Sequence, residues 1–190
     1  MHAHLGSIRA FALSALLALF LAAPSAMAEE EGYSVDEILA EAERFFGSST
    51  EGLAKVVEKV FADLGRPTGY VAGEEVSGAI GVGLRYGDGR LQLKSGGSRR
   101  VYWTGPSVGF DLGGNASKVF VLCYGMHRAG AIFQRFPAVD GSYYFVGGVG
   151  ANYQRSGDIT LAPIRLGVGL RAGASIGYMH YTPKKSWNPF

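Results

Sequence analysis

Two adjacent glutamates, Glu74 and Glu75, have the clearest potential for chemistry in this 190-residue sequence. A pair of carboxylates can divide general acid and general base roles in a hydrolytic reaction. The pair lies, however, in a segment with strand periodicity, and neighbouring residues of a strand point to opposite faces. We therefore expect a charge pair at the start of a strand, and keep a hydrolase that uses Glu74 or Asp111 as an alternative.

Two further reactive groups lie in apolar surroundings. Asp111 stands in "VGFDLGG", where we expect it to be buried and held by turn hydrogen bonds or by a cation such as Lys118 or Arg165. Cys123, the single cysteine, stands in "KVFVLCYG", which is apolar on both faces of a strand. We expect an inert core thiol in a strand covered on each side.

The histidines and serines give no further candidate. His127 and His180 have no carboxylate or cysteine at a metal-ligand spacing, and we expect Ser107, Ser117 and Ser142 to be turn or strand serines. Gly167-x-Gly169-x-x-Ala172 lacks the strand, helix and second strand that a dinucleotide site needs. The sequence thus predicts no catalytic residue, no metal site and no cofactor.

The N-terminus has the features of a secretory signal. Arg9 precedes the apolar run "FALSALLALFLAA", and Ala26-Met27-Ala28 provides small residues for cleavage. The run is shorter than the ~20 residues that a spanning helix requires. We expect residues 1–28 to be a signal peptide and the mature chain to begin at about Glu29. The net charge of +2, without a clustered basic face, argues against nucleic acid as a partner.

Two amphipathic helices are predicted in residues 29–66, as a helical segment that packs on the rest of the chain. Ser34 and Glu37 form a capping box for the first helix, which ends at Gly47. Ser49 or Thr50 caps the second helix, and Gly65 ends it. Each helix carries an apolar stripe that must lie on an apolar surface.

From residue 67 to 190 the pattern predicts a β-barrel domain with a C-terminal tail. Apolar residues alternate with glycine and arginine, and "GVGLR" occurs at both 81–85 and 167–171. Asp88-Gly89 predicts a tight hairpin, and "SGGS" at 95–98 and Ser156-Gly157 predict turns. A short helical stretch is expected at 127–136. The fold class is therefore mainly β, a small soluble curled antiparallel barrel of about ten strands with two N-terminal helices.

The alternation leaves two orientations open. The apolar face could point inward around an apolar cavity, or outward into lipid around a polar lumen, as in an outer-membrane channel. Two amphipathic helices favour the first orientation, since they can cover the outside or the open end of a sheet. On that interpretation a candidate apolar interior is formed by Ile80, Val82, Leu84, Ile164, Leu166, Val168, Leu170 and Ile176.

Several long stretches resemble one protein family. "GYSVDEILAEAERFFGSSTEGLAKVVEKVF", "GLRYGDG", "GPSVGFDLGGNASKVFVLCYG", "FVGGVGANY", "PIRLGVGLR" and the ending "WNPF" are similar to the EipA (envelope integrity protein A) family, over about Gly32 to Phe190. A local likeness to the lipid-binding SYLF (Ysc84-like) domain covers "GPSVGFDLGGNASKVFVLCYGMHRAGAIFQRF" through "FVGGVGANY".

The EipA resemblance implies a small periplasmic β-barrel with an apolar interior, which is needed for cell-envelope integrity and has no known enzymatic activity. It also implies a link to envelope polysaccharide or peptidoglycan, and no catalytic residues come with it. We therefore expect a periplasmic, non-enzymatic protein that binds an apolar or lipid ligand, or an envelope protein or polysaccharide, with peripheral membrane contact. An integral outer-membrane channel and an envelope hydrolase are the alternatives.

Overall fold

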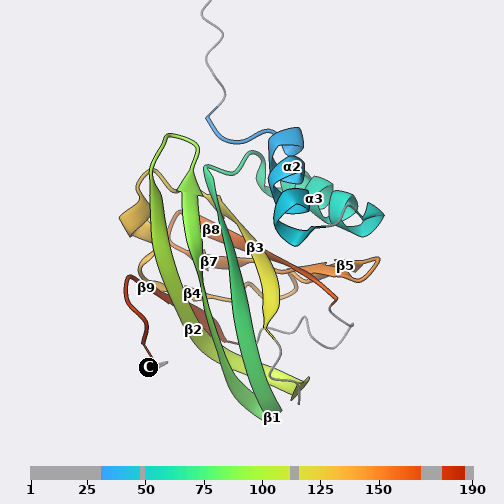
Figure 1. Ribbon diagram of the computed structural model, residues 1–190, viewed down its shortest axis with the longest axis vertical. Helices are drawn as coiled ribbons and strands as arrows, with labels where there is room; N and C mark the ends of the chain where they lie inside the picture. Colours follow the sequence, from blue (N-terminus) through green and yellow to red (C-terminus); the bar gives the residue numbers. More distant parts are fainter. Residues whose placement is uncertain (1–30, 48–49, 112–115, 168–176, 187–190) are drawn as a thin grey trace, which may run out of the picture. The chain divides into compact units, whose positions relative to one another are not determined.

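The computed structural model describes residues 31–47, 50–111, 116–167 and 177–186, which include two helices and nine strands (Figure 1). The expected signal peptide at 1–28 lies outside these residues. The elements are α2 (Val35–Phe46), α3 (Glu51–Leu64), β1 (Gly69–Leu93), β2 (Ser98–Asp111), β3 (Ser117–Tyr124), the 3-10 helix η2 (Ala129–Ile132), β4 (Arg135–Pro137), β5 (Tyr144–Val146), β6 (Val149–Ala151), β7 (Gln154–Ser156), β8 (Ile159–Leu166) and β9 (Tyr178–Thr182).

Both helices begin and end where their capping residues predict. The Ser34 hydroxyl accepts from the Glu37 N–H, and the Glu37 carboxylate accepts from the Ser34 N–H, so the capping box is confirmed. Thr50 caps α3 by accepting from the Leu53 N–H. Gly47, at a φ of 76°, ends α2 in the left-handed region that favours glycine.

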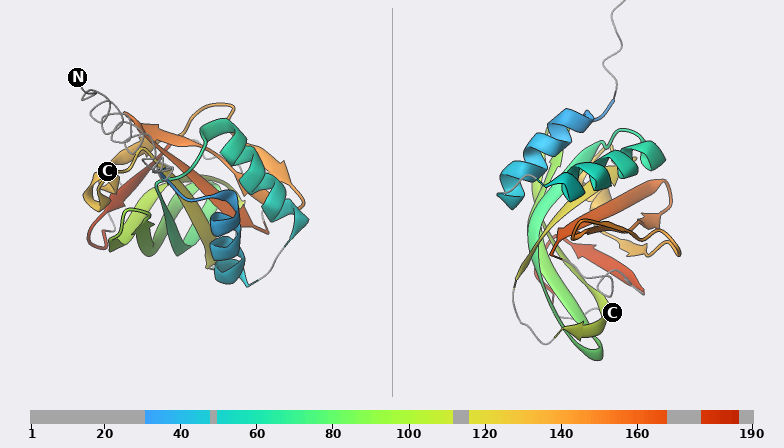
Figure 2. Two further views of the ribbon diagram at one scale, coloured as in Figure 1. Left: turned by 90° about the horizontal axis from the view of Figure 1, so that it is seen from above. Right: turned by 90° about the vertical axis from the view of Figure 1, so that its right-hand side faces the viewer.

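The strands pair antiparallel in one sheet of nine, in the order β4-β9-β2-β1-β3-β8-β6-β5, with β7 also paired to β8. The fold is therefore mainly β, as predicted. In the described part of the chain the sheet also approaches closure, because an isolated bridge joins Ala138, beyond β4, to Gln154 of β7. Figure 2 shows the resulting curl, with both helices on its outer side.

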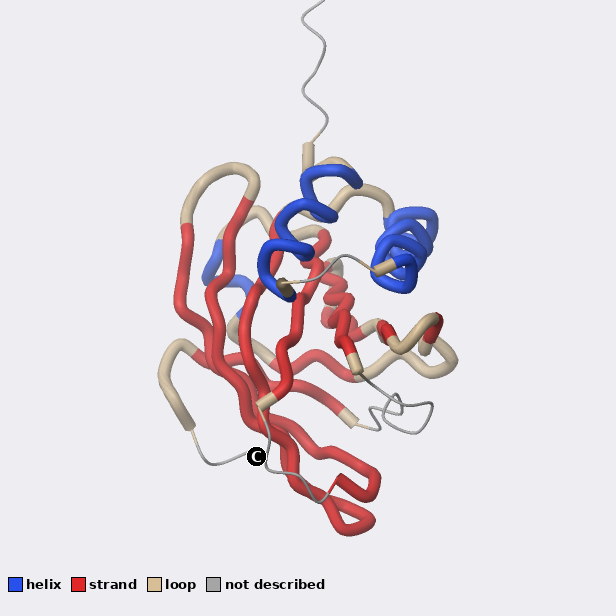
Figure 3. Tube along the Cα trace, turned by 45° about the vertical axis from the view of Figure 1, so that its right-hand side comes forward, coloured by secondary structure: helices blue, strands red, loops and turns tan. Residues whose placement is uncertain are grey.

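The element β1 folds back on itself. Its 25 residues would measure about 80 Å as one straight strand, but the Lys94 N–H donates to the Thr68 carbonyl at 3.0 Å. The two arms meet at the end labelled β1 in Figure 1. Together with the end of β2, which pairs with β1 as far as Ala79 and Asp111, they project beyond the rest of the sheet in Figure 3. The first arm pairs with β3 and the second with β2.

The predicted hairpin at Asp88-Gly89 is wrong. Asp88 and Gly89 pair with Tyr102 and Val101 inside the β1–β2 ladder. The reversal falls near the middle of β1, in a stretch whose alternation of apolar residues and glycine predicts a continuous strand. The predicted turns at 95–98 and at Ser156-Gly157 are confirmed, and the helical stretch expected at 127–136 is reduced to η2.

The sheet has two apolar faces, each with its own core. The inner core fills the curl and contains Val71, Leu91, Leu93, Val101, Trp103, Val119, Val121, Cys123, Met126, Ile132, Phe136, Leu161, Met179 and Tyr181. The outer core lies between the sheet and the helices and contains Ile38, Ala42, Leu53, Val56, Val57, Val60, Phe120, Leu122, Tyr124, Val149, Ala151, Ala162 and Ile164. Alternate residues of β3 and β8 thus serve different cores. No helix of the described residues is both long and apolar enough to span a membrane.

Candidate functional site

The three residues of the predicted apolar interior whose side chains the structure describes do not lie in the inner core. Leu84 is 38% exposed. Ile164 is fully buried and Leu166 partly so, but both belong to the outer core beneath the helices. The other five predicted residues lie outside what the structure describes: Val168, Leu170 and Ile176 as whole residues, and Ile80 and Val82 in their side chains.

The apolar residues face outward because the arginines next to them in the sequence point inward. Arg85 follows Leu84 and Arg165 follows Ile164, and both guanidinium groups reach Glu75 on the inner face. Strand alternation then directs the apolar neighbours outward. The sequence pattern identified the two faces of β8 correctly and assigned them to the wrong sides.

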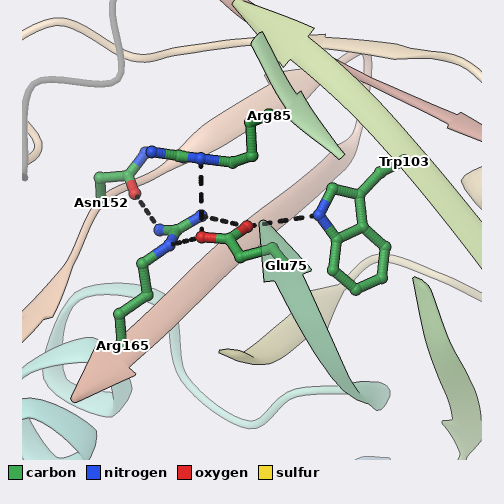
Figure 4. A network of polar contacts seen from close by, with 5 residues as sticks. All are labelled: Glu75, Arg85, Trp103, Asn152 and Arg165. Carbon is green, nitrogen blue, oxygen red and sulfur yellow. Dashed lines mark hydrogen bonds and ion pairs between the residues drawn. The ribbon is translucent and has the colours of Figure 1, made fainter. Parts of the chain in front are cut away.

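A buried polar network occupies the inner face (Figure 4). Arg165 Nε donates to Glu75 Oε1 at 2.5 Å, and Arg165 Nη2 donates to Glu75 Oε2 at 3.3 Å. Trp103 Nε1 donates to the same Oε2 at 3.3 Å, and Arg165 Nη1 donates to Asn152 Oδ1 at 3.2 Å. Arg85 Nε lies 3.6 Å from Glu75 Oε1. The network joins β1, β2, β8 and the segment between β6 and β7.

Glu75 and Arg165 each stabilise the charged form of the other. Burial alone would raise the pKa of Glu75, but the charges of Arg165 and Arg85 and the hydrogen bonds from Arg165 and Trp103 hold it below its ordinary value. Burial likewise disfavours the Arg165 cation, and Glu75 reverses this effect and raises its pKa. Both groups are therefore ionised at neutral pH.

This geometry makes Glu75 a poor acid–base catalyst. Its side chain is 5% exposed, and both carboxylate oxygens already accept hydrogen bonds. A general acid needs a raised pKa and a path to a substrate. Glu74 points the other way and is exposed, opposite Lys118 in the β1–β3 register, so the expectation that the two glutamates face apart is confirmed.

The cations suggested as partners of Asp111 have other contacts. Arg165 binds Glu75, and Lys118 donates to the Phe45 carbonyl at 2.8 Å. The side chain of Asp111 lies outside the structural description. Cys123 is fully buried in the inner core, while its neighbour Leu122 lies in the outer core, so the doubly covered strand is confirmed. Burial raises the pKa of the Cys123 thiol and keeps it protonated.

A groove of about 270 Å³ lies on the outer face beside α2. We call it the α2 groove. Its lining comes from α2, both arms of β1, and β3, and consists of Glu41, Arg44, Phe45, Tyr70, Ala72, Arg90, Gln92 and Phe120. Tyr70 stacks on Phe120 with ring centroids 4.9 Å apart, and Phe45 lies 6.1 Å from Phe120. The base of the α2 groove is therefore formed by the partly exposed Tyr70 and Phe45 rings over the fully buried Phe120, and its rim is polar.

The polar groups of the rim are divided between its two sides. On the α2 side, Glu41 Oε1 accepts from Arg44 at 2.7 Å and Glu41 Oε2 accepts from the Tyr70 hydroxyl at 3.2 Å. Burial, followed by the nearby Glu41 charge, raises the pKa of Tyr70 to about 12, so it stays protonated. On the opposite side, Arg90 donates to the neutral Ser98 hydroxyl at 3.2 Å.

Neither the network nor the α2 groove was predicted from sequence. Glu75 and Arg165 are 90 residues apart, and the groove needs Ala72 and Arg90 side by side, which only the fold-back of β1 provides. The sequence signal that could have indicated the network is that Arg85 and Arg165 alternate with apolar residues, on the same face as the glycines. If that face is buried, each arginine needs a carboxylate partner. Among the described residues no group of three or more His, Cys, Asp or Glu side chains could hold a metal ion.

Comparison with known proteins identifies the family. The family model described as envelope integrity protein A, EipA, matches residues 31–190. The chain belongs to the EipA family. The resemblance seen in the sequence is thereby confirmed, and the EipA match includes every element that forms the inner network and the α2 groove.

A solved structure supports the same fold for this EipA-family chain. It is a crystal structure of a β-barrel-like, uncharacterised protein from Brucella abortus, which is 42% identical and has a TM-score of 0.78. The match covers 84% of this chain and 99% of that protein. The comparison with curated proteins gave no match.

Proposed function

We propose that this EipA-family chain is a periplasmic, non-catalytic protein that supports cell-envelope integrity by binding another envelope component. The observation that carries the proposal is the match of the family model over residues 31–190. The export-type N-terminus at residues 1–28 supports delivery to the periplasm.

The polar network supports a non-catalytic role. Its carboxylate is ionised, buried and fully engaged by Arg165 and Trp103, so it stabilises the curl of the sheet instead of transferring protons. Glu74 is an exposed carboxylate that stands opposite Lys118 in the β1–β3 register. This position offers no buried environment that would suit a general acid or base.

Of the two alternatives, the outer face of the sheet favours a barrel in the aqueous periplasm and argues against an outer-membrane channel. In a channel the outward apolar residues contact lipid. Here Leu122 and Ile164 of the outer face pack against α2 and α3. The helices therefore occupy the surface of β3 and β8 that a channel would offer to lipid.

Binding is the activity that this arrangement can supply. The ligand class that fits best is apolar or lipid, because the α2 groove offers aromatic rings on an outer surface. An envelope protein or an envelope polysaccharide is the other class of partner, and the local SYLF likeness adds weight to lipid.

Deletion and complementation test this function. We expect a strain without the gene to become sensitive to deoxycholate and to large antibiotics, and the full chain to restore resistance. A chain without residues 2–28 should fail to restore it, and osmotic shock should release the complementing protein. Unchanged sensitivity of the deletion strain, or full rescue by the chain without the leader, would contradict the proposal.

A further inference from the structure

We propose that the α2 groove binds an anionic single-chain amphiphile, with the first carbons of its acyl chain on the aromatic base and its charged head at Arg90. This inference rests on the proposed function and specifies its ligand class and site. It also moves the apolar site from the interior of the barrel, where the sequence analysis placed it, to the outside.

The base of the groove suits a hydrocarbon chain. Ala72 stands directly opposite Phe120 in the β1–β3 register, and its small side chain leaves a depression between the Tyr70 ring and α2. The partly exposed rings of Tyr70 and Phe45 each pack against the fully buried Phe120 ring, so the surface is preformed. A preformed apolar surface binds hydrocarbon without the cost of ordering flexible side chains.

The charged residues of the rim favour an anionic head group on the side of the groove formed by β1. Glu41 could repel an anion, but it lies on the α2 side, where Arg44 and the Tyr70 hydroxyl already engage both of its oxygens. Arg90 is exposed, its donor contact is the neutral Ser98 hydroxyl, and Gln92 lies beside it in the rim. Within the described parts of the chain no carboxylate forms an ion pair with Arg90.

A second cation, Lys118 of β3, lies near the groove and contacts Phe45. Lys118 lies 5.4 Å from the centroid of the Phe45 ring, and it donates to a neutral backbone carbonyl. Lys118 is not one of the residues that line the groove, and the exposed Glu74 stands opposite it in the β1–β3 register. An anionic head at the β1 side therefore gains from Arg90, whereas a neutral head does not.

The size of the groove fits one end of a longer molecule. Sites that enclose a whole small ligand usually measure about 300–1,000 Å³, and the α2 groove is smaller, at about 270 Å³, and open to solvent. The head and the first carbons of a chain can occupy it while the remainder extends outward.

Titration calorimetry with dodecyl phosphate, below its micelle concentration, tests this site on the mature chain. We expect one bound molecule, no measurable heat from inorganic phosphate at the same concentration, and clearly weaker binding of neutral dodecyl maltoside. Arg90→Gln should weaken binding roughly two- to fivefold, the range of an exposed charge contact. Ala72→Leu should fill the depression and weaken binding about tenfold or more.

Arg128→Gln is the matched control, because it removes an exposed arginine at η2, away from the groove, and should leave the affinity unchanged. Equal thermal midpoints for all variants exclude misfolding as a cause. The proposal is overturned if dodecyl phosphate does not bind, if inorganic phosphate or dodecyl maltoside binds as well, or if Arg90→Gln and Ala72→Leu leave binding intact. Such a result would leave the envelope function standing, since deletion and complementation test that function separately.

Discussion

Arg165 on β8 and Glu75 on β1 form an ion pair across the inner face of the sheet, with Nε and Oε1 2.5 Å apart, although neither strand pairs with the other. The strand between them is β3, so the pair spans three strands. It fixes the curl of the sheet, and it explains why the arginine-bearing face of β8 points inward.

Glu75→Gln should lower the free energy of unfolding by about 3–5 kcal/mol, because it leaves the buried Arg165 cation without its counter-ion. Glu74→Gln removes the same charge from the neighbouring exposed position and should change stability by no more than about 0.5 kcal/mol. Urea denaturation of the two variants makes the comparison. Equal effects would show that the pair does not stabilise the fold.

The stabilisation from Glu75 should disappear in acid. The folded pKa of Glu75 lies below its ordinary value of 4.5, so its contribution is complete above 4.5 and is lost as the pH falls through the lower, folded pKa. The test compares the free energies of unfolding of the wild type and Glu75→Gln, first near neutral pH and then in steps below pH 4.5. The difference between the two proteins should become smaller only below pH 4.5. A difference that narrows above that value would indicate a raised pKa.

Gly87→Ala should destabilise the protein by about 1–3 kcal/mol, because a Cβ at Gly87 would overlap the Trp103 ring. That indole donates to Glu75, so its displacement also weakens the network. Gly78→Ala is the control, since Gly78 also lies in β1 and a Cβ there would meet no atom within 4 Å. Thermal unfolding checks the pair, and equal midpoints would contradict the close packing of Trp103 on Gly87.

Cys123 should react slowly with a thiol reagent in the native protein and at once after denaturation. The thiol is fully buried in the inner core, and burial raises its pKa above its ordinary value, so little thiolate is present. Absorbance after addition of dithionitrobenzoate follows the reaction. Immediate labelling of the folded protein would show that the inner core opens readily.

The sequence predicted what local chemistry determines. The capping residues Ser34 and Thr50 fixed the start of both helices, and alternation identified β8 and the doubly covered β3, because these signals act within a few residues. Alternation cannot say which face of a strand is inside when both faces are covered. That choice depends on Arg165 meeting Glu75, which is a contact between distant parts of the chain.

The fold-back of β1 was missed for a similar reason. The reversal is not at Asp88-Gly89, where turn chemistry suggested it, because those residues complete the ladder with β2. Gly73 and Gly87 instead make room for Trp103, since a side chain at either position would overlap the indole ring. Steric demands from a tryptophan on another strand are not visible in a local pattern.

Complementation by the double variant Glu74→Gln/Asp111→Asn tests most directly the central claim that this EipA-family protein supports the envelope without catalysis. These are the carboxylates that a hydrolase would use according to the sequence, while Glu75 is engaged in its ion pair. The variant, at wild-type abundance in the periplasm, should restore full resistance to deoxycholate in the deletion strain. Loss of rescue at unchanged abundance and stability would contradict the account and indicate an enzyme.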